Sequence, residues 1–140
     1  MNAFQEYFID VFKYKYADFA GRATRSEYWY FILFYFAITL LILPISFMLP
    51  ESLMMVSFGL LGIFILAIII PSLALVVRRL HDTGKSGWWY LISFIPLGSI
   101  VLLVFFCLDS EPGTNKWGPN PKNPSLEGDV TDHLLEDEIV

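Results

Sequence analysis

Residues 29–49 read WYFILFYFAITLLILPISFML and contain no charged side chain. Two more uncharged runs follow, at residues 52–77 and 88–108. A helix needs roughly 20 apolar residues to cross about 30 Å of hydrocarbon, and each run is long enough. Only helices and closed barrels satisfy their backbone hydrogen bonds in lipid, and the alternating polarity of barrel strands is missing here. The runs predict an all-α, polytopic membrane protein with transmembrane helices at 28–49, 53–77 and 88–108.

The composition supports a membrane location. Of the 140 residues, 56% are hydrophobic and 16% are charged, whereas about a quarter of the residues in a soluble domain are charged. A soluble bundle of three fully apolar helices would have no polar face to present to water. We therefore interpret residues 1–122 as a single membrane domain.

Prolines interrupt the second and third runs. Pro71 removes a backbone donor and usually bends a helix, and we expect this helix to continue beyond the apolar run and to carry Arg78 and Arg79 to the headgroup region. Pro96 and Gly98 lie in the middle of the third run. Such a break marks a binding cavity in some membrane helices and has no special role in many others.

Bulky apolar side chains recur with helical spacing at the N-terminus, which predicts an amphipathic helix over residues 1–17. This helix is expected to lie in the membrane interface with its aromatic face toward the acyl chains, or to pack beneath the other helices. The stripe consists of Phe4, Tyr7, Phe8, Val11, Phe12 and Lys15.

Basic residues near the span ends predict the orientation, because cytoplasmic loops carry an excess of lysine and arginine. Seven basic residues precede the first run or separate the second from the third, two follow the third, and the link at 50–52 has none. The N-terminus and the loop at 78–87 are therefore expected in the cytoplasm, and the C-terminus in the periplasm. The seven are Lys13, Lys15, Arg22, Arg25, Arg78, Arg79 and Lys85.

The chain after the third run changes character. Residues 109–122 are rich in proline, glycine and asparagine, which predicts a polar loop. From Asp109 to the end there are two lysines and eight acidic residues. We expect the acidic tail over 123–140 to be disordered, because it has too few large apolar residues to form a core.

Two polar segments, at residues 19–29 and 78–89, fall on the same predicted side. Basic pockets on the cytoplasmic side suit anionic lipid headgroups, and guanidinium groups bind phosphate well. One hypothesis is that these segments bind an anionic headgroup, and the other is that their charges only fix the orientation of the loops. The candidate binding residues are Arg22, Arg25, Arg78, Arg79, His81, Asp82 and Lys85.

His81 and Asp82 also allow a membrane enzyme in which the two act as a base and its orienter. Neighbouring residues on a helix point in different directions, however, and no nucleophile stands at an obvious position. On a helix that continues this far, Arg78 would instead reach both side chains, at i+3 and i+4.

Several classes of site are excluded by residue type. Cys107 is the single cysteine, so the chain forms no internal disulfide, and no histidine or cysteine cluster suits structural zinc. The sequence Gly84-Lys85-Ser86 is similar to the end of a phosphate-binding loop, but Arg79 stands where its first glycine would be. We expect no metal, no cofactor and no nucleic-acid partner.

Three motifs together resemble a known family. They are FxGRxTRxEYW at residues 19–29, PSLALxVRRLHDTGKSGWW at residues 71–89 and GTNKWGPNP at residues 113–121. The set resembles the bacterial YhaH-like inner-membrane family, domain of unknown function 805, over roughly residues 4–122. The resemblance implies a small multi-pass protein of the bacterial inner membrane and supplies no catalytic residues. The acidic extension after Pro124 departs from the family pattern.

The sequence thus favours a non-enzymatic inner-membrane protein whose cytoplasmic cluster binds anionic lipid or a partner protein, either a second copy or another membrane protein. The alternative is a subunit of a small oligomeric transporter or channel, although no apolar run contains an acid or base for an ion relay. A membrane enzyme that uses His81 and Asp82 is the third hypothesis.

Overall fold

A computed structural model describes residues 2 and 4–123, which are mostly helical and contain no strand. The predicted all-α fold is confirmed for this part of the chain. The described residues divide into two compact units, one formed by residues up to Asp18 and Ser26–Leu75 and the other by Phe19–Arg25 and the residues from Val76 onward. The single membrane domain over residues 1–122 stays a prediction. The acidic tail expected over 123–140 lies outside the described residues, apart from Asn123.

The helices are η1 (Gln5–Ile9), α1 (Asp10–Tyr14), α2 (Arg25–Met48), α3 (Glu51–Asp82), η2 (Gly87–Phe94) and α4 (Gly98–Cys107).

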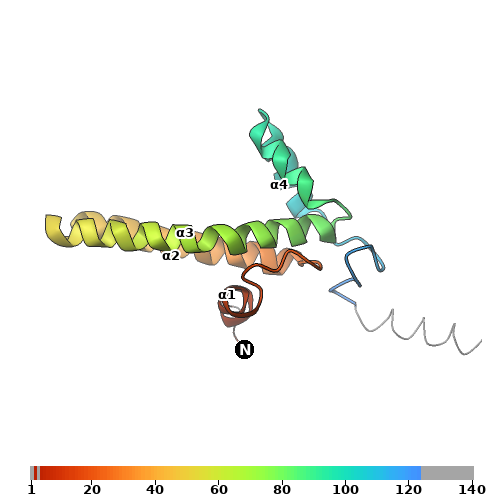
Figure 1. The fold of residues 1–140 in the computed structure, drawn as a ribbon, viewed down its shortest axis with the longest axis horizontal. Coiled ribbons are helices and arrows are strands. Elements are labelled where there is room, and N and C mark those ends of the chain that lie inside the picture. The colour runs from red at the N-terminus through yellow and green to blue at the C-terminus, as the bar shows by residue number, and fades with distance from the viewer. Residues whose placement is uncertain (1, 3, 124–140) are drawn as a thin grey trace, which may run out of the picture. The chain divides into compact units, whose positions relative to one another are not determined.

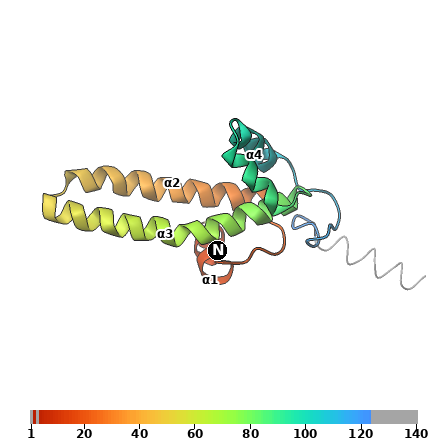
Figure 2. The same ribbon diagram turned by 45° about the horizontal axis from the view of Figure 1, so that its top comes forward.

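The two longest helices, α2 and α3, have 24 and 32 residues, and both are long and apolar enough to cross a membrane. In the first unit they run side by side and antiparallel (Figures 1 and 2). The hydroxyl oxygens of Ser46 and Ser57 lie 2.6 Å apart and join the two helices by a hydrogen bond. As predicted, α3 continues beyond its apolar run and includes Arg78 and Arg79.

A tyrosine compensates for the proline within α3. Pro71 has no N–H to donate to the carbonyl of Ala67 four residues earlier. The hydroxyl of Tyr16 donates to that carbonyl instead, at 2.9 Å. Sequence spacing does not reveal this role of Tyr16, because its partner is 51 residues away.

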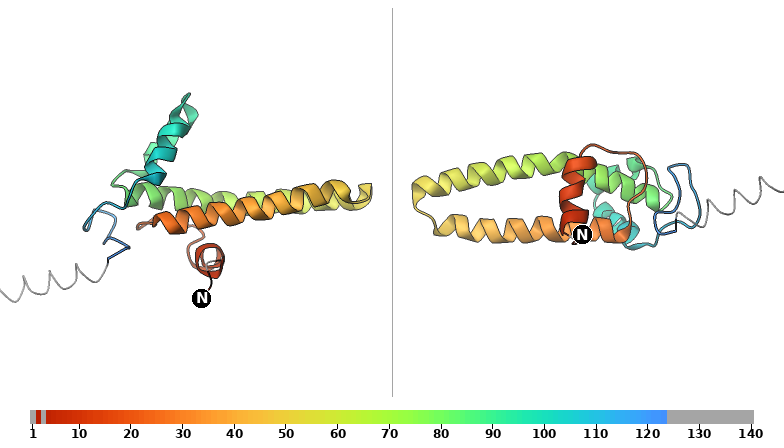
Figure 3. Two further views of the ribbon diagram at one scale, coloured as in Figure 1. Left: turned by 180° about the vertical axis from the view of Figure 1, so that it is seen from behind. Right: turned by 90° about the horizontal axis from the view of Figure 1, so that it is seen from below.

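The N-terminal helical segment packs with its aromatic stripe against α2. Phe8 and Val11 are buried, and the Phe8 ring lies 5.4 Å from that of Phe31. Tyr7 stacks on Tyr30 at 5.2 Å. The segment lies across α2 and α3 (Figure 3, right), so the predicted apolar face contacts protein.

The third apolar run differs from the expected continuous helix over 88–108. Pro96 disfavours the helical conformation in the residue before it, and Ile95 is extended. Leu97 then adopts a left-handed conformation with a φ of 66°. The result is two shorter segments, η2 and α4, that contact each other and meet in a turn (Figure 1). Gly98 permits this turn, since a Cβ atom there would lie 1.7 Å from the carbonyl oxygen of Ile92.

Candidate functional site

The last turn of α3 brings the polar residues of the second unit to one place. Gly84 has a φ of 74°, which glycine adopts without steric cost. Its N–H donates to the carbonyl of His81 at 3.0 Å, and that of Lys85 donates to Leu80 at 2.9 Å. These two bonds end α3 in the Schellman manner.

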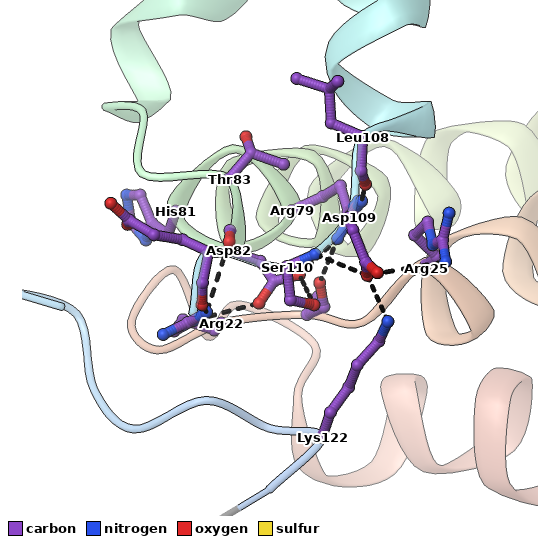
Figure 4. Close-up of polar contacts among 12 residues, drawn as sticks. Arg22, Arg25, Arg79, His81, Asp82, Thr83, Leu108, Asp109, Ser110 and Lys122 are labelled. Atoms are coloured by element: carbon purple, nitrogen blue, oxygen red, sulfur yellow. Dashed lines mark hydrogen bonds and ion pairs between the residues drawn. The ribbon is translucent and has the colours of Figure 1, made fainter. Parts of the chain in front are cut away.

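Asp82 lies at the centre of the polar cluster and has no exposed side-chain surface. Arg22 donates to its Oδ1 at 3.0 Å. Oδ2 accepts from Arg79 and from the hydroxyl of Ser110, the latter at 2.6 Å (Figure 4). The three donors come from the segment before α2, from α3 and from the segment after α4. We call this arrangement of residues 19–25, 78–84 and 106–120 the clasp.

The two arginines that bind Asp82 also bind backbone carbonyls. The Arg22 side chain, 1% exposed, donates to the carbonyls of Gly113 at 2.8 Å and of Glu111 at 2.5 Å. Arg79 is fully buried and donates to the carbonyl of Phe106 at 3.2 Å and to that of Leu108. The Asp82 carboxylate neutralises only one of the two positive charges. The carbonyl oxygens stabilise the remaining positive charge of the two guanidinium groups.

Backbone hydrogen bonds join the same three segments. The N–H of Ala23 donates to the carbonyl of Arg78 at 3.0 Å, and the carbonyl of Ala23 accepts from Arg79 at 3.2 Å. The N–H of Glu111 donates to the carbonyl of Asp82 at 2.7 Å. The clasp is therefore held by both backbone and side chains.

His81 has partners that differ from those of its neighbour. Its Nδ1 lies 3.1 Å from the carbonyl oxygen of Gly21. Because a carbonyl only accepts, we assign the proton to Nδ1. The ring stacks on Trp117 with a centroid distance of 4.3 Å. Asp82 is bound to Arg22, Arg79 and Ser110, so these contacts do not form the base and orienter expected of a dyad.

Arg25 and Lys85 lie at the end of α4. Arg25 donates to the carbonyl of Cys107 at 3.4 Å, and its side chain is 45% exposed. The ammonium of Lys85 lies 4.5 Å from the centre of the Phe105 ring. Cations are stabilised near a helix C-terminus by the carbonyls exposed there. We call these two residues the rim cations.

Asp109 is an exposed carboxylate beside the rim. It accepts a hydrogen bond from Lys122 and lies 3.6 Å from the Arg25 guanidinium. The bond from Lys122, followed by the backbone N–H of Ser110, holds the pKa of the Asp109 carboxyl below its usual value. The group is therefore negative throughout the neutral range.

The predicted site residues separate into two groups. Arg22, Arg79 and Asp82 come together in the interior, and Arg25 and Lys85 lie at the rim. The expected pairing of Asp82 with Arg78 is corrected: the ion pairs described for Asp82 are with Arg22 and with Arg79, at i+3. Arg78 is also buried.

Sequence reasoning missed the contribution of the segment after α4. Ser110 binds Asp82, Trp117 stacks on His81, and Asn115 donates to the carbonyl of His81 at 2.9 Å. The motif at residues 113–121 was a signal that this segment matters, but it did not indicate its partners.

A family match covers all of the clasp except its last residue, Asn120. The profile described as protein of unknown function (DUF805) matches residues 16–119. The chain belongs to the DUF805 family. It is 42% identical over 118 residues to inner membrane protein YhaI of Escherichia coli strain K12, across 84% of this chain and 96% of that protein.

A second relative matches this chain over a similar length. The chain is 36% identical over 124 residues to inner membrane protein YhaH of the same strain, across 84% of this chain and 97% of YhaH. No solved structure matches. The matched relatives are bacterial inner-membrane proteins by name, in agreement with the apolar helices of this DUF805 chain.

Proposed function

We propose that this protein is a non-enzymatic protein of the bacterial inner membrane that binds anionic lipid headgroups through the rim cations, Arg25 and Lys85. The observation that carries the proposal is their position at the end of α4, where Arg25 contacts Cys107 and Lys85 contacts Phe105. The Trp89 ring lies 5.7 Å from that of Phe105. Tryptophan and basic residues at one level are typical of the headgroup region.

The charge distribution supports an anionic ligand at the second unit. Its described residues include seven lysines and arginines and three acidic residues, a net charge of +4 with histidine neutral. The described part of the first unit has two lysines and five acidic residues, a net charge of −3. Anionic lipids attract basic clusters next to a span with about 1 kcal/mol per cation.

The arginines of the interior have a different role in this proposal. Arg22 and Arg79 are buried and already bind Asp82 and backbone carbonyls, so they position the rim rather than contact lipid. Arg25 has long contacts, 3.4 Å to a carbonyl and 3.6 Å to Asp109. A guanidinium has five N–H donors, and phosphate oxygens are stronger partners than a solvated carbonyl.

The orientation follows from the same charges. We infer that α2 and α3 cross the membrane and that the clasp faces the cytoplasm, because basic residues concentrate on that side of spans. The turn between the two helices, around residues 49–51, has no basic residue and would face the periplasm.

Native mass spectrometry of the full-length protein purified with its lipids tests the proposal. We expect retained phosphatidylglycerol or cardiolipin, and a loss of at least half of it in the Arg25→Gln/Lys85→Gln variant. The matched control is Lys13→Gln/Lys116→Gln, which removes the same charge away from the rim. Equal retention in both variants and the unchanged protein would refute the proposal.

A further inference from the structure

We propose that η2 and α4 form a re-entrant hairpin that inserts into the acyl chains of one leaflet, so that the chain before α2 and the chain after α4 lie on the same side of the membrane. This replaces the expected third crossing and the expected periplasmic C-terminus. The inference does not depend on headgroup binding by the rim cations.

The two ends of the apolar run meet in the clasp. The run begins a few residues after Asp82 and ends just before Ser110, yet Ser110 donates to the Asp82 carboxylate at 2.6 Å. Arg22, which precedes α2, binds the carbonyls of Gly113 and Glu111. A helix that crossed the membrane would separate these partners by about 30 Å of hydrocarbon. The contacts therefore require both ends on one side.

A contact between two side chains of the run also indicates a hairpin. The rings of Trp89 and Phe105 make an edge contact at 5.7 Å. In one continuous helix, two residues 16 positions apart would be separated by about 24 Å. This contact belongs to two antiparallel legs.

The lengths of the legs match one leaflet. With 8 residues in a 3-10 helix, η2 extends about 16 Å. With 10 residues, α4 extends about 15 Å. Each is close to half of a hydrocarbon core about 30 Å thick, so a hairpin anchored at the headgroups would end near the bilayer centre.

The tip of the hairpin is apolar and exposed. Phe94, Ile95 and Leu97 are 79%, 61% and 75% exposed, a surface that acyl chains would cover. The backbone of the turn is also hydrogen-bonded, which insertion in lipid requires. Ile95 donates to Ile92 at 3.0 Å, and Gly98 donates to Ile95 at 2.9 Å.

Labelling of single cysteines with a membrane-impermeant maleimide tests the topology. In a Cys107→Ala background, the reporters are Phe19→Cys before α2, Ser52→Cys at the turn between α2 and α3, and Asn123→Cys after α4. We expect positions 19 and 123 to label together in inverted vesicles and position 52 to label in spheroplasts. Labelling of position 123 together with position 52 would overturn the hairpin.

Cross-linking gives a second measurement in the same background. The Trp89→Cys/Phe105→Cys variant should form an intramolecular disulfide on mild oxidation in membranes, in most of the molecules. The control pair, Phe94→Cys/Phe105→Cys, places one cysteine at the tip and one near the base, and should remain reduced. A Trp89/Phe105 pair that cross-links no more than this control would contradict the hairpin, even if the labelling agreed with it.

Discussion

A buried carboxylate that accepts hydrogen bonds from two guanidinium groups holds three charges away from water, and each is stable only while the others remain. In the clasp, Asp82 is this carboxylate and Arg22 and Arg79 are the partners. Loss of one member of a buried ionic group leaves the rest uncompensated, at a cost of about 3–5 kcal/mol. The backbone carbonyls around Arg22 and Arg79 are uncharged and cannot replace the negative charge of Asp82.

We therefore expect Asp82→Asn to destabilise the protein by about 3–5 kcal/mol. A thermal unfolding curve in detergent, followed by tryptophan fluorescence, would show a large decrease of the midpoint. The matched control is Asp109→Asn, which removes an exposed carboxylate and should leave the midpoint unchanged. A variant at position 82 as stable as this control would mean that the clasp does not hold the second unit together.

Tyr16 allows a smaller test at the same scale. In Tyr16→Phe the part-buried carbonyl of Ala67 loses its 2.9 Å donor, and a hydrogen bond contributes about 0.5–1.5 kcal/mol net to stability. The same unfolding measurement should show a moderate decrease. Tyr14→Phe is the control, because Tyr14 is 69% exposed. If both substitutions lowered the midpoint equally, the Tyr16 hydroxyl would not compensate for the N–H that Pro71 lacks.

At this scale the sequence predicted residue types better than partners. Helical spacing correctly indicated that an arginine pairs with Asp82 on α3, but it selected Arg78, whereas Arg79 forms the pair. Positions i+3 and i+4 are both within reach on a helix surface. The contacts of the neighbouring chain decided between them, and local spacing does not include those contacts.

Among the helical elements, the hairpin depends on one glycine. Because a Cβ atom at position 98 would lie 1.7 Å from the Ile92 carbonyl oxygen, we expect Gly98→Ala to push the legs apart and to destabilise the protein by about 1–3 kcal/mol. Gly62→Ala is the control, since that position has open space around it. Both variants are compared by thermal unfolding, and a Gly98 variant as stable as its control would contradict the tight turn.

The elements of the first unit could be predicted from composition and period alone. Uncharged runs of sufficient length gave α2 and α3, and the N-terminal stripe gave the segment that packs on them. The third run could not be predicted in this way. Its length and hydrophobicity are those of a span, and the effect of Pro96 depended on Leu97 accepting a left-handed conformation, which is uncommon for a residue with a large side chain.

For the whole molecule, the exposed charges of the rim and the buried charges of the clasp should respond differently to salt. Exposed charges are screened beyond about 10 Å at 0.1 M salt, whereas buried pairs are screened much less. Raising the salt from about 0.05 M to about 0.5 M should therefore weaken the retention of anionic lipid at the rim. It should leave the unfolding midpoint, which depends on the clasp, nearly constant.

The two quantities are measured on the same preparation by native mass spectrometry and by thermal unfolding. Lipid retention that does not respond to salt would argue against binding by the rim cations. A midpoint that falls in parallel with retention would indicate that the ions of the clasp are accessible to solvent.

The assembly of the clasp lay beyond what sequence patterns show. Arg22 and Asp82 are 60 residues apart, and Arg22 and Glu111 are 89 apart. No period of a helix or strand connects such positions. The three family motifs marked all three segments of the clasp, but they carried no information on which side chains meet.

These separations also have a consequence for biosynthesis. When the ribosome has delivered α2 and α3 to the membrane, Arg22 and Arg79 still lack the carbonyls of residues 106–113 that they bind in the finished protein. The nascent chain must keep these two arginines solvated until residues 106–113 emerge. A chain that stops after Cys107 would expose an incomplete polar site, in which Arg22 lacks the carbonyls of Glu111 and Gly113.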